Sequence, residues 1–165
     1  MTINVKASIT GSISASGDLS QLVATLTAAV AELSFAQGTG AAEVDKVFAD
    51  TRTLAPSTTE DLDLAGSMVG IDGLTFAPAK IKGILISAAA GNTNNVLFGG
   101  DANGLAGLFG NVNDLNVIRP GGALLWVDPS GGLTVTNSTG DILQVANSGS
   151  GSSVTYNIVI IGASA

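Results

Sequence analysis

The stretch that decides the fold is Val154-Thr-Tyr-Asn-Ile-Val-Ile-Ile161, near the end of a chain of 165 residues. Its even-numbered residues are all apolar or aromatic, and residues two apart share one face of a β-strand. The opposite face is polar at Thr155 but turns apolar at Val159 and Ile161. This pattern predicts a central strand covered on both sides, or a strand whose end is buried against a neighbouring subunit.

Upstream of this stretch, short apolar runs of strand length alternate with clusters of Gly, Asn, Asp, Pro and Ser. From Pro78 onward these turn signals recur about every 8–12 residues, the spacing expected of an antiparallel sandwich or barrel. The predicted strands are 47–54, 58–64, 81–87, 95–98, 115–119, 123–127, 133–136, 141–146 and 154–161. We therefore predict an all-β fold, either an antiparallel β-sandwich or a jelly-roll-like domain.

The N-terminal residues have a different composition and fit more than one structure. Residues 2–17 are rich in Ser, Thr and Gly, which predicts an arm or an edge strand. Residues 18–36 could form one short helix, which their alanines favour, or strands, which their threonines favour. We expect an N-terminal arm or edge segment over 1–40 and a β-sandwich domain over 41–165. The helix would place on one face Leu22, Leu26, Val30 and Leu33.

The charge and the missing residue types narrow the possible functions. The chain has six basic and thirteen acidic residues, a net charge of −7, and neither Cys nor His. Disulfides, Cys- or His-ligated metals and His-dependent nucleophilic catalysis are therefore excluded. So few cations argue against nucleic-acid binding. We predict a protein that is not an enzyme and has no catalytic residues, cofactor or metal.

We expect neither an export signal nor a membrane-spanning segment in this chain. The N-terminus lacks the basic and then long apolar segment of a secretory signal. The most apolar stretch, 22–36, is interrupted by polar residues and falls short of the ~20 apolar residues that span a bilayer. We expect synthesis in a cytoplasm and no membrane partner.

Three neighbouring acidic residues form one candidate set of metal ligands. Glu60, Asp61 and Asp63 lie close together in sequence, and Ca²⁺ prefers several oxygen ligands. In a strand, however, Asp61 and Asp63 would point to one face and Glu60 to the other. We therefore predict a solvated strand face here. The segment 99–104 lacks the spaced carboxylates of a calcium loop and is predicted to be a turn.

The candidate interface residues are apolar or cationic side chains near glycine-rich turns. In the segment 104–110, three apolar residues lie among glycines and would either plug the end of the sandwich or contact a neighbouring molecule. A tryptophan in the predicted strand 123–127 could be core or subunit contact, and an arginine before Pro120 could pair with a carboxylate at an interface. These candidates are Leu105, Leu108, Phe109, Trp126 and Arg119.

Three segments resemble a known class of proteins. Residues 48–66, 118–129 and 141–162 are similar to segments of small virion structural proteins of tailed bacteriophages, of the capsid decoration (cement) type. The resemblance extends over roughly residues 40–163. It implies a non-enzymatic virion protein, made in the host cytoplasm, that binds the outer surface of the capsid and stabilises it. The implied partners are the major capsid protein and further copies of the chain, with a trimer favoured.

Two other classes of function remain open at the level of sequence. The chain could be a minor tail or neck component, or the base of a receptor-binding assembly, in which case few copies per particle are expected. It could also be an extracellular lectin-like binding module. With one Trp and one Tyr, the chain offers little aromatic surface for sugar stacking, which counts against the lectin alternative.

Overall fold

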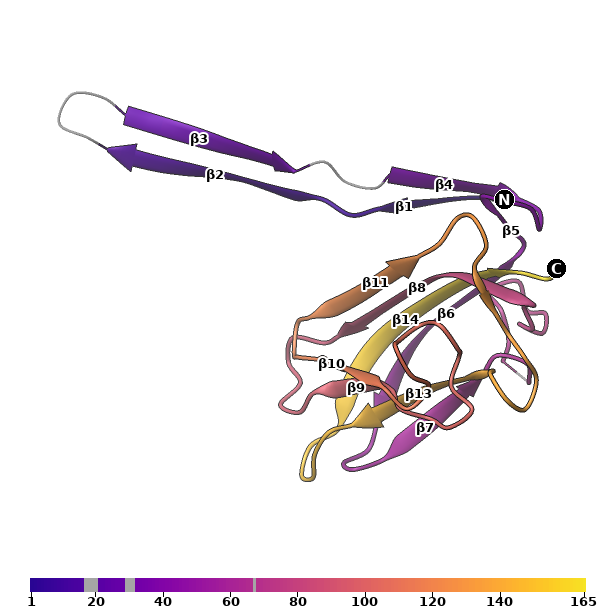
Figure 1. Cartoon of the computed structure of the whole chain (residues 1–165). Coiled ribbons are helices and arrows are strands. Elements are labelled where there is room, and N and C mark those ends of the chain that lie inside the picture. Colours follow the sequence, from indigo (N-terminus) through magenta and orange to yellow (C-terminus); the bar gives the residue numbers. More distant parts are fainter. Residues whose placement is uncertain (17–20, 29–31, 67) are drawn as a thin grey trace. The chain divides into compact units, whose positions relative to one another are not determined.

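The computed structural model describes residues 1–16, 21–28, 32–66 and 68–165 (Figure 1). The described residues form β-strands and contain no helix, so the prediction of an all-β fold is confirmed. The short N-terminal helix is a wrong alternative for the described part of 18–36, which is strand; residues 18–20 and 29–31 lie outside the description. The chain divides into two compact units, Met1–Ala36 and Gln37–Ala165.

The first unit is built from two antiparallel ladders. Strand β1 (Thr2–Lys6) pairs with β4 (Glu32–Gln37), and β2 (Ile9–Ser16) pairs with β3 (Gln21–Ala28). The strand preference of Thr and of β-branched residues is satisfied here by cross-strand pairing. Pairing with residues 2–16 therefore determines the strand conformation of residues 21–28 and 32–36, which local propensity leaves undecided.

The second unit contains two larger sheets, which face each other as a β-sandwich (Figure 1). One sheet has the order β11-β8-β14-β6, with the short β12 also paired to β8; the other has the order β10-β9-β13-β7. All pairings between these strands are antiparallel. The first sheet comprises β6 (Lys46–Leu54), β8 (Lys80–Ala88), β11 (Ala123–Val127), β12 (Leu133–Thr134) and β14 (Val154–Ala163). The second comprises β7 (Thr59–Asp63), β9 (Val96–Gly99), β10 (Leu115–Ile118) and β13 (Ile142–Asn147), and the two-residue β5 (Glu43–Val44) precedes β6.

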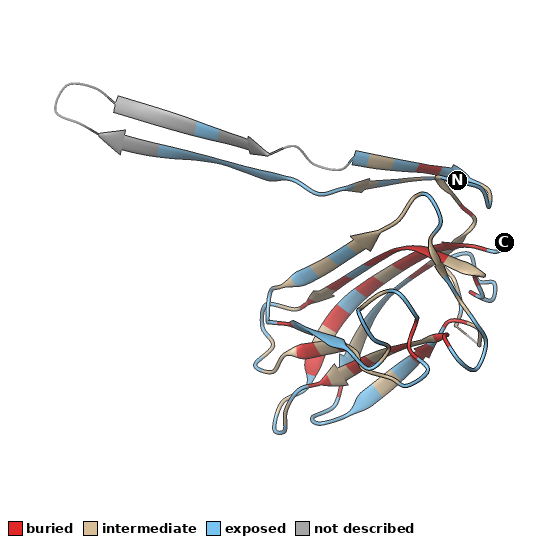
Figure 2. Ribbon diagram, in the orientation of Figure 1, coloured by how far each residue is buried: buried red, intermediate tan, exposed pale blue. Residues whose placement is uncertain are grey.

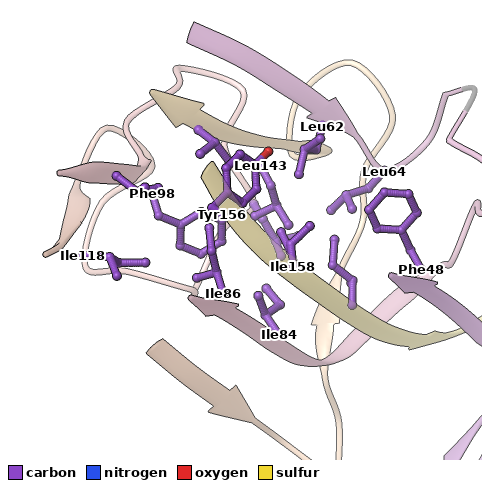
Figure 3. Close-up of a cluster of buried hydrophobic side chains, with 14 of the residues drawn as sticks. Phe48, Leu62, Leu64, Ile84, Ile86, Phe98, Ile118, Leu143, Tyr156 and Ile158 are labelled. Carbon is purple, nitrogen blue, oxygen red and sulfur yellow. The ribbon is translucent and has the colours of Figure 1, made fainter. Parts of the chain in front are cut away.

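The core lies between these sheets, and alternate residues of β9, β13 and most of β14 are buried in it (Figure 2). Figure 3 shows Tyr156 and Ile158 of β14 among side chains from both sheets, including Phe98 and Leu143. Strand β14 is central, with β8 on one side and β6 on the other. The outer face of β14 is covered at one end because Ile161 packs over Gly83, where an added Cβ would lie 2.9 Å from the Ile161 side chain. The predicted central position of this strand is confirmed, but its outer face is exposed at Asn157 and buried only toward its C-terminal end.

Candidate functional site

The predicted interface loop lies between β9 and β10 and is anchored to the sandwich. Leu105 is buried in the core, and its backbone N–H donates to the Ile142 carbonyl at 3.1 Å. Leu108 and Phe109 are half-buried against the same core, and the Phe109 ring meets Phe98 edge-on at 6.0 Å between centroids. These contacts fit the plug alternative, while an interface role of the loop stays a prediction.

The other two candidates lie on opposite sides of Pro120. Trp126 is opposite Ile84 in the β11–β8 ladder and is half-buried against the core. Arg119 is exposed at the end of β10. The structure brings Leu105, Leu108, Phe109 and Trp126 to one core, whereas Arg119 is directed to solvent.

The three acidic residues of β7 lie on two different faces of the strand, as the alternation of side chains predicts. Asp61 and Asp63 are exposed, whereas Glu60 is half-buried on the face that also carries Leu62. Each exposed carboxylate has a local hydrogen-bond donor: Asp61 accepts from the Gln144 side chain at 3.0 Å, and Asp63 accepts from a backbone N–H at 3.0 Å. Within the described ranges, no three acidic side chains are grouped closely enough to hold a metal ion.

Glu60 belongs to a polar network that the sequence did not predict. The Tyr156 hydroxyl donates to Glu60 Oε1 at 2.6 Å, and Arg52 Nη1 donates to Glu60 Oε2 at 2.7 Å. Arg52 Nε also lies 3.1 Å from Asp50 Oδ2, and its guanidinium stacks 5.7 Å from the centroid of the Phe48 ring. The network joins β6, β7 and β14 and so bridges the two sheets. The sequence contains one signal for such a network, because a Tyr on an otherwise apolar strand face needs a hydrogen-bond partner when it is buried.

Burial and hydrogen bonding shift the pKa of two groups in the second unit, Gln37–Ala165, which we call the body. Burial raises the pKa of the Tyr156 hydroxyl well above its usual 10.0, and the hydrogen bond to Glu60 raises it further. In the turn after β11, the Ser130 hydroxyl and backbone N–H lower the pKa of Asp128 to about 2, and the backbone N–H groups of Gly131 and Gly132 contribute. Both shifts are explained by groups that stabilise the fold.

A polar cluster of amides fixes the turn between β13 and β14. Asn147 is buried, and its side-chain amide donates to the Ser152 carbonyl at 2.8 Å and to the Ala55 carbonyl at 3.0 Å. Its side-chain oxygen accepts from the Asn94 amide at 3.0 Å and from the Gly149 N–H at 3.2 Å. Every polar atom of Asn147 therefore serves to hold the backbone.

The body exposes a hydrogen-bonded apolar turn between β7 and β8, which we name the apolar turn and define as residues 69–74. Its three large side chains are directed to solvent: Val69 is 59% exposed, Ile71 66% and Leu74 63%. The Gly70 N–H donates to the Leu74 carbonyl at 2.8 Å, and the Leu74 N–H donates to Asp72 Oδ1 at 3.0 Å. The Ile71 N–H is tied to β6 through the Val47 carbonyl. Three exposed apolar side chains within one hydrogen-bonded turn make residues 69–74 a candidate contact surface.

A second exposed apolar area lies on the outer face of the larger sheet. Leu85 is opposite Leu125 on one side and Val159 on the other, and the two leucines are exposed. A shallow hollow of about 480 Å³ lies beside them, lined by Ala49, Asp50, Thr51 and residues 157–159. The lining mixes small, polar and apolar groups and has no cluster of groups suited to chemistry.

Comparison with known proteins assigns no family to this chain. No family model and no curated protein matches the chain. Among solved structures, the chain is similar to one described as "Structure of IMPa from Pseudomonas aeruginosa in complex with an O-glycopeptide", with a TM-score of 0.36 and 15% identity. That match covers 77% of this chain and 15% of the other. The part of the chain that the structure describes has no helix able to cross a membrane.

Proposed function

We propose that the chain is a non-enzymatic structural protein of a tailed-phage virion, which binds the outer surface of the capsid and stabilises the shell. The observation that carries this proposal is the apolar turn, a preformed group of exposed apolar side chains on a β-sandwich body. The similarity of residues 48–66, 118–129 and 141–162 to decoration proteins supports the same assignment.

The proposed mechanism of stabilisation is mass action. A protein that binds the assembled lattice and not its free subunits shifts the equilibrium toward the closed shell. Because many copies bind one particle, weak individual contacts are sufficient. A turn that is already ordered loses little conformational freedom on docking, which favours binding through Ile71 and its neighbours.

The first test is the copy number of the chain relative to the major capsid protein, measured by quantitative mass spectrometry of purified particles. We expect a copy number of the same order as that of the capsid protein. A value an order of magnitude lower would refute shell-wide decoration and place the chain in the tail or neck. Absence from the particles would refute every virion assignment.

The second test locates the docking surface. Ile71→Asp places a charge on a side chain that contributes little to the core, so we expect an unchanged melting temperature and at least a tenfold loss of binding to particles that lack the protein. Ser150→Asp, in the exposed turn between β13 and β14, is the matched control and should bind as the wild type does. Equal binding of the two variants would contradict docking through the apolar turn.

A further inference from the structure

The two sides of the β-sandwich differ in the charge of their edge strands. β10 leads into β11 through residues 119–122, and β6 leads into β7 through residues 55–58, so each pair of edge strands lies on one side (Figure 1). Charged side chains on an edge strand oppose pairing with another chain. The β10 and β11 strands contain none. The β6 and β7 strands contain Lys46, Asp50, Arg52, Glu60, Asp61 and Asp63.

Strand β11 is the longer of the two uncharged edge strands, and all of its residues are apolar. Ala123 and Leu125 are exposed, and the other three residues are half-buried. An apolar edge strand in contact with water is prone to pair with a strand of another chain. Among the edge strands of the described body, β11 is therefore the least protected against such pairing.

The ladder with β8 determines which backbone groups of β11 are open. The Ala88 N–H donates to the Gly122 carbonyl at 2.9 Å, and the Asp128 N–H donates to the Lys82 carbonyl at 2.9 Å. Hydrogen-bonded pairs alternate along an antiparallel ladder, so the even-numbered residues of β11 direct their backbone groups toward β8. The odd-numbered residues direct their N–H and carbonyl groups away from β8, to the open edge. These residues are Ala123, Leu125 and Val127.

We propose that the open edge of β11 pairs antiparallel with β11 of a second copy of this chain, about a two-fold axis at Leu125. A two-fold axis perpendicular to the sheet places Leu125 opposite Leu125 of the second copy, and the two residues exchange both backbone hydrogen bonds. Ala123 then lies opposite Val127 of the second copy, and Leu124 lies opposite Trp126. Every pair is apolar, and every open backbone group of the strand gains a partner.

A row of apolar side chains on the outer face of the sheet supports a second copy as the partner. Leu85 lies opposite Leu125 in one ladder and opposite Val159 in the other, so the row crosses three strands and stops at the open edge. Leu85 is 41% exposed and Leu125 is 40% exposed. The proposed axis continues the row with the same two leucines of the second copy. Neighbouring leucines on paired strands shield one another from water.

Opposite charges at the two ends of β11 favour the antiparallel arrangement. Arg119 is exposed in the turn before the strand, where its carbonyl accepts from the Gly122 N–H at 2.8 Å. Asp128 follows the strand directly. In the proposed register Gly122 lies opposite Asp128 of the second copy, which brings the turn that carries Arg119 next to a carboxylate at both ends. A parallel arrangement of the two strands would place like charges together.

The size of the contact predicts a weak dimer. Five residues at ~3.4 Å each span about 17 Å, and two sheets ~10 Å apart present a side roughly 20 Å thick. Pairing would bury a total of about 700 Å², below the ~1,000 Å² of a stable specific interface, so we expect a dissociation constant in the upper micromolar range. A two-fold contact closes with two copies and gives a dimer, not the trimer that the resemblance implies. The pairing does not rest on the proposed function, because it requires no virion partner.

The test is sedimentation velocity of the full chain from micromolar to millimolar concentrations. We expect the wild type to dimerise and Leu125→Lys to raise the dissociation constant at least tenfold, because two ammonium groups would meet at the axis in place of two leucines. Leu85→Lys is the matched control, since Leu85 is equally exposed on the same face. Its two copies would lie three strand spacings apart, about 14 Å, which exceeds the screening length at physiological salt, so this variant should dimerise nearly as the wild type does.

A mixing experiment tests the position of the axis. Leu125→Lys and Leu125→Glu each place like charges opposite each other in their own dimers. In an equimolar mixture an ammonium group lies opposite a carboxylate, so we expect the mixed dimer to form at least threefold more tightly than either variant alone. This recovery requires that residue 125 lie opposite itself.

Three results would overturn the proposal. A wild-type chain that stays monomeric at millimolar concentration would show that the edge has another occupant, whether or not the chain binds particles. An equal effect of Leu125→Lys and Leu85→Lys, or no effect of either, would place the contact away from this edge. A mixture that associates no more tightly than its components would refute the axis at Leu125.

Discussion

Tyr156 provides a direct test of the polar network, because it is the only tyrosine of the chain. Its side chain is fully buried, and its hydroxyl donates to Glu60 at 2.6 Å. Tyr156→Phe removes the hydroxyl and keeps the ring in the core. We expect the free energy of unfolding of this variant to be about 1.5–3 kcal/mol lower at neutral pH, the usual contribution of a hydrogen bond to a charged acceptor. Glu60 keeps its contact with Arg52 and part of its exposure to water, so the loss stays moderate.

The pH dependence of this effect follows from the raised pKa of Tyr156. The folded pKa lies above the unfolded value of 10.0, so the stability that comes from keeping the phenol protonated is complete below pH 10. It is lost as the pH rises above 10, because the unfolded chain then releases the proton and the folded chain does not. By about pH 11 the wild type should have lost about 1.4 kcal/mol through this group.

Two measurements check this expectation. The phenolate absorbance of the folded wild type should stay low past pH 10 and appear when urea unfolds the protein at the same pH. The free energy of unfolding of Tyr156→Phe should lack the alkaline loss due to the phenol, and subtracting the two proteins cancels the titration of the lysines. A phenolate transition near pH 10 in the folded protein would refute the reasoning. Parallel alkaline losses in the two proteins would refute it as well.

Two further predictions concern the turns of the body. Asp128→Asn should lower stability at pH 5, because the carboxylate accepts from the Ser130 N–H at 2.9 Å and the Gly132 N–H at 2.9 Å. The lowered pKa of Asp128 means that this stability is present above about pH 4 and lost as the pH falls toward 2, so melting temperatures of variant and wild type should converge there. Asn147→Ala should cost about 1–3 kcal/mol in urea unfolding, since it removes the donor to the Ser152 carbonyl at 2.8 Å and the acceptor of the Gly149 N–H at 3.2 Å. The Ser152 carbonyl keeps one donor, because the Asn94 amide lies 3.0 Å from it. A cost below about 0.5 kcal/mol, the size of an ordinary surface substitution, would contradict this role of Asn147.

The strands of the body were predictable because their residues alternate with period two and end at turn-forming residues. Strand β14 and strand β8 were found within a few residues of their observed bounds. The alternation also separated Glu60 from Asp61 and Asp63 correctly. Local sequence contains this information because it depends only on which face a residue occupies.

The partners of Glu60 were not predictable by the same reasoning. Arg52 is eight residues away and Tyr156 ninety-six, and their meeting depends on how one sheet packs on the other. Residues 21–28 and 32–36 show the same limit, since Ala and Thr favour different structures and pairing with residues 2–16 decides between them. Strand register and sheet packing are long-range properties, so single-sequence patterns leave them open.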